Sequence, residues 1–213
     1  MVNSKVIAMT QAAVRPRVSF EEYIDICAQT DEPYELVRGK IHQMNPPTVL
    51  HYRIAKFLEQ ALDRAIEELF DLDEWETFRD AGQRTEADSS RLPDIAIVSR
   101  VEADRLLKQT AVFQSPSLLV IEVVSPSSAS EDYDEKLREY QKLGVSEYWT
   151  VDHEGLGAAK YIGFPKAPTV TVHELVEGKY QAKRFRGDKL IESPMFENLN
   201  LTANQVFSAG RTR

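Results

Sequence analysis

The sequence predicts an α/β fold, an α+β mixed sheet with helices packed on it. Three observations support this prediction. The segment 51–70 repeats its apolar residues at helical spacing over four to five turns. The segment 117–125 is strongly apolar and lacks alternation, as expected of a central strand covered on both faces. Segments with helical periodicity and segments with strand-like periodicity both occur along the chain, which argues against a β-sandwich and against a helical bundle.

Four segments are expected to be helical. The first begins with Ser19 followed three residues later by Glu22, a capping-box pattern. The third ends at Gly144, a residue suited to a left-handed cap. The predicted helices are 19–29, 51–70, 131–145 and 202–208.

The remaining periodic segments are expected to be strands. A two-stranded hairpin is predicted over 34–44, with its turn at Arg38-Gly39, because glycine readily adopts positive φ. A second hairpin turn is expected at Glu177-Gly178. The further predicted strands are 75–83, 92–99, 117–125, 147–152, 158–164, 169–176 and 179–185.

Length and composition restrict the kind of protein. A chain of 213 residues suits one domain, expected over 16–208, and residues 1–15 carry no period and are expected to be a mobile tail. The formal charge of −8 excludes a strongly basic nucleic-acid coat but not a local basic groove. The absence of a bilayer-length apolar run and of a secretory signal pattern predicts a cytoplasmic protein without a membrane partner. The single Cys27 excludes an internal disulfide.

Glu122 interrupts the apolar run Leu118–Ile121 in the expected central strand. A buried carboxylate is costly unless it is paired, hydrogen-bonded or bound to a metal. It is therefore a candidate metal ligand or acid/base group at the carboxyl end of a strand, where sites in open α/β sheets gather. The alternative is that the strand is already exposed here, because Ser125-Pro126 follows closely.

Asp94 follows Pro93 directly and opens the next predicted strand. Alone, such an aspartate often only satisfies nearby backbone donors. Paired with Glu122 from a later strand, it would supply oxygens for a hard cation such as Mg²⁺, as metal-assisted phosphodiester hydrolysis needs.

Lys136 lies at the border of the apolar stripe of the helix that follows Glu122. Its long stem could bring the ammonium over the sheet toward that carboxylate. The alternative is a solvated ion pair with Asp132, one turn earlier on the same helix.

These residues stand in a series of motifs that resembles a known family. The series is LPDIAIV, LLVIEVVSPSS, an Asp and Lys four residues apart, and GVSEYWTVD, with YELVRGKI upstream and ESPMFENLNL downstream. It looks like a large bacterial family of restriction endonucleases, once described as a domain of unknown function, within the PD-(D/E)XK nuclease superfamily. The resemblance spans about residues 18–205 and implies a restriction-endonuclease-like core with flanking helices, an extra N-terminal hairpin and C-terminal strands.

The resemblance also assigns residues. It makes Asp94 and Glu122 the acidic metal ligands, with the carbonyl of Val123 as a further ligand. The superfamily's usual lysine would fall at Val124, and Lys136 is the candidate that replaces it from the next helix. Glu35 resembles the additional acidic residue that many members contribute from an N-terminal element; its alternative is an exposed hairpin carboxylate.

The function expected on this basis is a Mg²⁺-dependent endodeoxyribonuclease, with Mn²⁺ as a possible substitute ion. The partner would be DNA, and superfamily members are often homodimers. The alternative is a catalytically inactive nuclease fold that serves as a binding or dimerisation module, which the net acidic charge favours.

Two further expectations concern residues outside this group. His51 begins the long helix and either points at the site or lies at the edge of the core, and we favour the second. Phosphate contacts are expected from local positive charges, for which the sequence suggests Arg53, Lys56, Arg84, Arg91 and Lys142.

Overall fold

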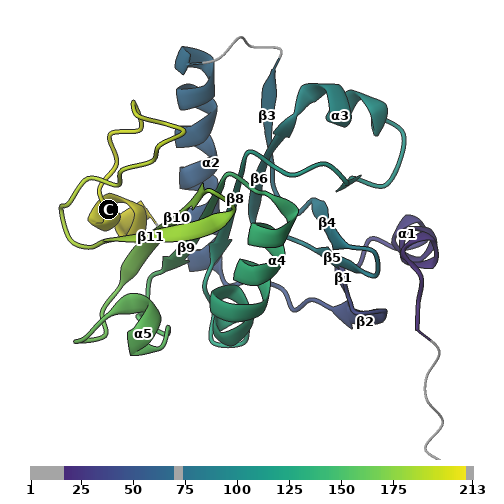
Figure 1. Cartoon of the computed structure of the whole chain (residues 1–213), viewed down its shortest axis with the longest axis horizontal. Coiled ribbons are helices and arrows are strands. Elements are labelled where there is room, and N and C mark those ends of the chain that lie inside the picture. The colour runs from purple at the N-terminus through teal and green to yellow at the C-terminus, as the bar shows by residue number, and fades with distance from the viewer. Residues whose placement is uncertain (1–16, 70–73, 210–213) are drawn as a thin grey trace, which may run out of the picture.

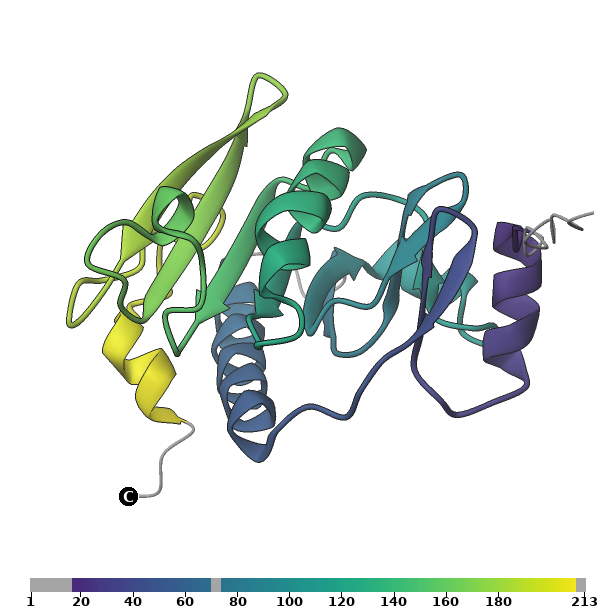
Figure 2. The same ribbon diagram turned by 90° about the horizontal axis from the view of Figure 1, so that it is seen from below.

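The computed structural model describes residues 17–69 and 74–209. Two mixed β-sheets lie side by side with helices on their faces, as Figures 1 and 2 show. The predicted α/β class is therefore confirmed, although the chain forms two sheets where one was expected. The expected tail over 1–15 lies outside the described residues.

The larger sheet has six strands in the order β11-β10-β9-β8-β6-β3. Strands β8 and β9 run parallel, and every other neighbouring pair is antiparallel. Every residue of β8 is buried, as predicted for a central strand. The strands are β3 (Trp75–Phe78), β6 (Ile95–Ser99), β8 (Leu119–Val123), β9 (Glu147–Asp152), β10 (Thr169–Val176) and β11 (Lys179–Phe185).

The smaller sheet has five strands in the order β2-β1-β5-β4-β7. The predicted hairpin over 34–44 is present as β1 and β2, but the single strand predicted over 75–83 is wrong. The chain turns at Asp80, whose φ is 53°, so that β4 leaves β3 and joins the second sheet. The strands are β1 (Tyr34–Val37), β2 (Lys40–Gln43), β4 (Gly82–Glu86), β5 (Ser89–Arg91) and β7 (Val112–Phe113).

Three of the four predicted helices are present largely as expected. Ser19 and Glu22 form the capping box, and Gly144 caps its helix with φ 96°. The described helices are α1 (Phe20–Ala28), α2 (Val49–Leu69), α3 (Arg100–Arg105), α4 (Lys136–Leu143), α5 (Ala159–Ile162) and α6 (Ala203–Ala209). Within this part of the chain, none of them is long and apolar enough to cross a membrane.

Two segments differ from their predictions. The segment 158–164 contains the short helix α5, not a strand, and its last turn ends at Gly163 with φ 84°. The helix predicted over 131–145 begins as a π-helix, η1 (Glu131–Glu135), in which the N–H of Lys136 donates to the carbonyl of Glu131. Such wide turns are frequent at functional sites.

The two faces of β8 meet different helices. Ile121 and Val123 point toward α2 and pack in the same core as Leu58. Val120 points the other way, into the core that contains Tyr140 of α4. Because side chains alternate along a strand, Glu122 is directed to the α4 side with Val120. The sheet thus aims this carboxylate at the helix that carries Lys136.

Candidate active site

A cleft of about 1150 Å³ opens beside the carboxyl ends of the parallel strands β8 and β9. Its walls come from the β1–β2 hairpin, the start of α2, and the loops that follow β8 and β9. The structure places all five residues singled out from the sequence in these walls, namely Glu35, Asp94, Glu122, Val123 and Lys136.

Glu122 is 4% exposed, so it does not lie at a solvent-exposed strand end. Its Oε1 accepts a hydrogen bond of 3.0 Å from the hydroxyl of Tyr140 and lies 3.0 Å from Nζ of Lys136. Burial raises the pKa of Glu122 well above its usual value, although Lys136 opposes the rise. The neighbouring carboxylates of Asp132 and Asp94 raise this pKa further. The site therefore needs positive charge to keep Glu122 ionised.

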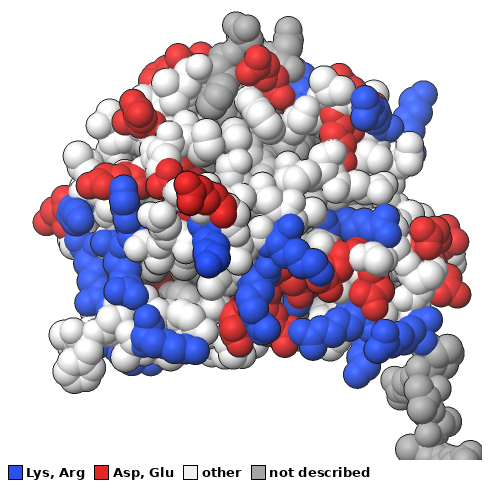
Figure 3. Space-filling view, viewed as in Figure 1, with Lys and Arg blue, Asp and Glu red and all other residues white. Residues whose placement is uncertain are grey.

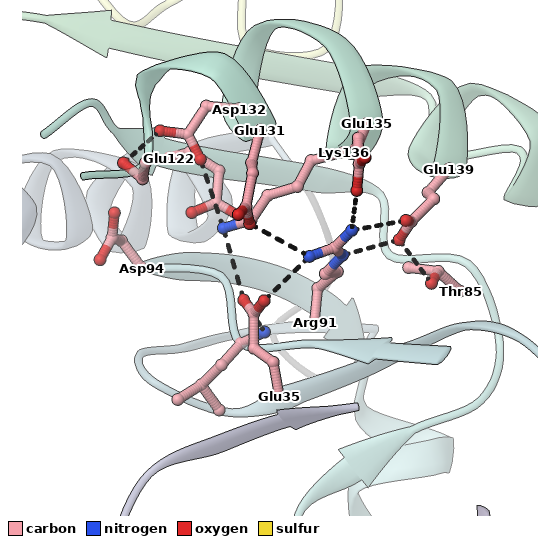
Figure 4. A network of polar contacts seen from close by, with 12 residues as sticks. Glu35, Thr85, Arg91, Asp94, Glu122, Glu131, Asp132, Glu135, Lys136 and Glu139 are labelled. Carbon is pink, nitrogen blue, oxygen red and sulfur yellow. Dashed lines mark hydrogen bonds and ion pairs between the residues drawn. The ribbon is translucent and has the colours of Figure 1, made fainter. Parts of the chain in front are cut away.

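Lys136 supplies part of that charge from the first residue of α4. Figure 4 shows its ammonium between three carboxylates. Nζ lies 3.0 Å from Glu122, 3.3 Å from Asp132 and 3.4 Å from Glu35. Burial disfavours the charged ammonium, but these three carboxylates together raise the pKa of Lys136 well above its usual value. The pair with Asp132 exists as the sequence suggested, but it is buried and not solvated.

Asp94 is tied to the strand that carries Glu122. Its Oδ2 accepts a hydrogen bond of 2.7 Å from the backbone N–H of Val123. Its Oδ1 lies 2.6 Å from Nε2 of His51. The preference for His51 as a core-edge residue was therefore wrong, because its ring is directed at the candidate site.

Glu35 reaches the same cluster from the smaller sheet. It is 1% exposed, which rules out the exposed hairpin carboxylate considered from the sequence. Its Oε2 lies 3.0 Å from a terminal nitrogen of Arg91, and its Oε1 accepts the backbone N–H of Leu92 at 3.1 Å. Burial alone would raise the pKa of Glu35, but the positive charges of Lys136 and Arg91 together lower it.

The expectation that Arg91 contacts phosphate is wrong, because its side chain is fully buried. It donates to both carboxylate oxygens of Glu139, at 2.6 and 2.8 Å, and it also reaches Glu131 and Glu135. Sequence reasoning missed this role. The available signal was the spacing of three glutamates every four residues along η1 and α4, which places them on one face that needs a cation.

The cleft as a whole is acidic. Its Lys and Arg residues are Arg38, Lys40 and Lys136. Its Asp and Glu residues are Asp31, Glu32, Glu35, Asp80, Asp94, Glu122, Glu131, Glu135 and Glu154. Such a surplus of negative charge attracts cations and repels a polyanion.

The donor atoms suit a hard divalent cation. The carboxylates of Asp94 and Glu122 and the carbonyl of Val123 are oxygen ligands of the kind that Mg²⁺ and Mn²⁺ bind. Across residues 17–69 and 74–209, no group of three or more His, Cys, Asp and Glu side chains is arranged to hold a metal ion. An ion bound by the two carboxylates would complete its ligands with water or substrate oxygens, as Mg²⁺ commonly does.

Comparisons with known proteins agree with the fold. The sequence model of the Uma2 family, described as "Putative restriction endonuclease", matches residues 20–204. A crystal structure from Anabaena variabilis ATCC 29413, described as a putative nuclease belonging to DUF820, is similar with a TM-score of 0.68. The two share 20% sequence identity, and the match covers 91% of this chain and 99% of that chain. No curated protein has a significantly similar sequence.

Proposed function

Because the chain belongs to the Uma2 family of putative restriction endonucleases, we propose that it is a metal-dependent endodeoxyribonuclease. It would hydrolyse phosphodiester bonds of DNA in the cleft beside β8 and β9. The observation that supports this most is the contact of 3.0 Å between Nζ of Lys136 and Oε1 of Glu122, in a cleft that Asp94 also lines.

Lys136 can take the place of the lysine that the superfamily usually has two residues after Glu122, where this chain has Val124. Val124 is fully buried and packs with Tyr133 and Ile162, so this strand position cannot present a charge to the cleft. The ammonium arrives instead from the start of α4 and lies beside the same carboxylate. In this proposal one helix therefore supplies the cation that the superfamily usually takes from the strand.

Asp94, Glu122 and the Val123 carbonyl would hold a Mg²⁺ ion, with Mn²⁺ as a substitute. When bound, such an ion lowers the pKa of a water ligand and offsets charge on the phosphate. The hydrogen bond from Val123 N–H to Oδ2 of Asp94 fixes this carboxylate relative to β8. His51 fixes its other oxygen. Asp94 is thus oriented before substrate binds, which is what precise placement of a reacting group requires.

Lys136 would orient the attacking water or stabilise the negative charge of the pentacovalent transition state. An ammonium held in a largely buried position stabilises developing charge more strongly than one in water. Glu35 contributes by holding Lys136 from the opposite sheet, at 3.4 Å from Nζ. Glu35 is in turn held by Arg91 and by the backbone of Leu92.

The acidic cleft has a consequence for DNA as the substrate. The carboxylates that line the cleft would repel the phosphates of DNA until a bound divalent cation offsets the negative charge of the cleft. DNA binding in the cleft itself should therefore depend on the metal ion.

Two parts of the proposal concern organisation. We propose one restriction-endonuclease-like domain over residues 16–208. A homodimer stays a prediction. β11, one of the two edge strands of the larger sheet, belongs to a strand-rich segment, 147–191, that would supply the edge for pairing.

Cleavage of supercoiled plasmid DNA in Mg²⁺ or Mn²⁺ tests the function. Asp94→Asn and Glu122→Gln should each lower the cleavage rate by at least about a hundredfold. Asp134→Asn, which changes an exposed carboxylate on η1, should cleave as the wild type does. Cleavage at the wild-type rate by both site variants would remove the proposed site.

The second candidate is an inactive nuclease fold that binds or dimerises. The observation that favours it is the enclosure of Lys136 by three carboxylates in an acidic cleft, an arrangement in which the charge of the lysine is already paired. A wild-type protein that neither cleaves DNA nor binds Mn²⁺ would support this candidate.

A further inference from the structure

A group of positive charges lies at α5 and the adjoining end of β11, although the chain has a net charge of −8. Figure 3 shows blue side chains over this side of the molecule, and red ones near the base of α4. We call this group, together with Phe164, the α5–β11 surface. Its residues are Lys160, Phe164, Lys166, Arg184 and Arg186.

The cations of this surface mainly contact uncharged groups. The pKa of Lys160 is raised by Tyr161 and, less strongly, by the carboxylate of Asp134. Arg184 donates to the carbonyls of Tyr161 and Lys160. Arg186 donates to the carbonyls of Ile162 and Pro165 and to the hydroxyl of Thr169. Within the described residues, the ion pairs with carboxylates include none of the four cations of this surface. A carbonyl or hydroxyl orients a guanidinium but leaves its full positive charge.

Lys160 and Lys166 add to the positive charge of the surface. Lys166 donates to the carbonyl of Leu156 at 3.1 Å, and Nζ of Lys160 lies 4.4 Å from the ring centre of Tyr161. Neither contact removes charge. The field of these charges reaches into the protein, because the charge of Arg184 adds to burial in lowering the pKa of His173.

A purely structural role explains only part of the group. The two arginines bind the carbonyls at the end of α5, and such contacts stabilise a helix end. The lysines make no comparable cap, and Phe164 is 90% exposed, which stabilises nothing within the chain. An exposed aromatic ring beside such cations is the combination that contacts nucleic acids, through phosphates and exposed bases.

The surface adjoins the proposed active site. Leu156, which holds Lys166, belongs to the loop whose His153 and Glu154 line the cleft. The ring of Tyr161 stacks on that of Tyr133 in η1, with centres 5.1 Å apart. On the hairpin side, Arg38 and Lys40 line the cleft from β1–β2. The acidic cleft is therefore flanked by cations from two different parts of the chain.

We propose that the α5–β11 surface binds the phosphate backbone of duplex DNA beside the cleft, so that binding does not depend on the acidic walls. The choice of DNA rests on the proposed nuclease function. Phosphate contacts position a nucleic acid without reading its sequence. The surface would hold the duplex while the cleft engages one phosphate.

Fluorescence anisotropy of a labelled DNA duplex, in EDTA and at several salt concentrations, tests this proposal. The double variant Lys160→Gln/Lys166→Gln should bind more weakly. Its slope of log affinity against log salt should be smaller by about 2, because two phosphate contacts are lost. The matched control Arg105→Gln/Lys108→Gln removes the same charge from exposed positions on and just after α3 and should bind as the wild type does.

A third variant addresses the aromatic ring. Phe164→Ser changes no charge, so it should leave the salt slope of duplex binding unchanged. Circular dichroism checks that each variant is folded. Because Lys160 and Lys166 make no buried ion pair, their replacement should not disturb the fold.

The outcomes separate this proposal from the nuclease function. The proposal that this surface binds DNA would be overturned if the wild type did not bind the duplex in EDTA. It would also be overturned if both double variants lost the same amount of affinity. Binding to anionic lipid vesicles without binding to DNA would also overturn it. Loss of affinity confined to Lys160→Gln/Lys166→Gln would support DNA binding by the α5–β11 surface even if the protein cleaves no DNA. Unchanged affinity of this variant, with normal metal-dependent cleavage, would overturn the proposed surface and leave the nuclease function standing.

Discussion

Nζ of Lys136 lies 3.0 Å from Oε1 of Glu122, in a cluster that also contains Asp132 and Glu35. This contact joins the start of α4 to the central strand of the larger sheet. Because the ammonium offsets the charge of three buried carboxylates, it matters for stability as well as for the proposed chemistry.

Replacing Lys136 by Met should lower the free energy of unfolding by about 3–5 kcal/mol at pH 8, since it leaves buried carboxylates without their cation. Urea denaturation measures the change. Arg138→Met removes an exposed cation paired with Asp134 and should change stability by less than about 1 kcal/mol. If both variants were equally stable, the cluster would not be the buried ionic centre described above.

Lys136→Arg separates the two roles of this residue. It keeps the positive charge, so most of the stability lost in Lys136→Met should return. DNA cleavage should stay impaired, because the planar guanidinium cannot place its donors as the ammonium does. Recovery of full cleavage would show that only the charge matters at this position.

Arg91→Lys should destabilise the protein although the charge is retained. The guanidinium binds both oxygens of Glu139 and also reaches Glu35, and a lysine ammonium cannot make these contacts together. We expect a loss of about 2–4 kcal/mol in urea denaturation. Arg79→Lys, at a partly exposed ion pair with Glu59, is the matched control and should lose less than about 1 kcal/mol.

The orientation of Asp94 by His51 gives a further test. His51→Leu should lower the cleavage rate and the affinity for Mn²⁺ about ten- to a hundredfold, as is usual when the partner of a metal ligand is removed. His51→Gln keeps an N–H donor and should recover part of the loss. His42→Leu, an exposed residue of β2 that also lines the cleft, should have little effect. Equal activity of His51→Leu and the wild type would contradict the assignment.

The sequence indicated the centre of the site because its signal is local. An acidic residue inside the apolar strand β8 stands out from its neighbours, and strand alternation directs Glu122 to the same face as Val120. The following helix then has to cover that face, which brings Lys136 within reach. The burial of Glu122 is confirmed, whereas the roles of the site residues stay predictions.

The surrounding network was not visible because it joins distant segments. Arg91 follows two serines and looks like a surface residue in the sequence, yet its partners lie on α4 and in the β1–β2 hairpin. The orientation of His51 depends on how the loop before α2 places the helix against Asp94. Such contacts between separate parts of the chain follow from tertiary packing and not from periodicity.

Short elements were the other source of error. The segment 158–164 is too brief for its period to distinguish a helix from a strand, and its aromatic and β-branched residues favoured the strand. The carbonyls at the end of α5 are held by Arg184 and Arg186 from a later strand. Long-range contacts therefore decided its structure.

His173 makes stability depend on pH. Burial between Tyr148 and Tyr180, and secondarily the charge of Arg184, lowers the pKa of His173 to about 4 from 6.5. Between these two values the unfolded chain binds a proton that the folded protein does not, so stability falls as the pH falls. Its contribution should decrease by up to roughly 3 kcal/mol between pH 7.5 and pH 4.5.

His173→Phe keeps an aromatic ring and removes this titration. The measurement is the difference in urea stability between the wild type and this variant at several pH values, because the raised pKa of Asp132, about 6, acts in the opposite direction in both proteins. The difference should shift in favour of the variant as the pH falls. A difference that does not change with pH would contradict the assignment.

The most direct test of the site is calorimetric titration of Mn²⁺ into the metal-free protein at pH 7.5. We expect saturable binding by the wild type and by Asp104→Asn, an exposed carboxylate on α3. Glu122→Gln, which is nearly isosteric, should show no binding. Equal binding by the wild type and Glu122→Gln, or no binding by the wild type, would contradict a metal site at Asp94 and Glu122.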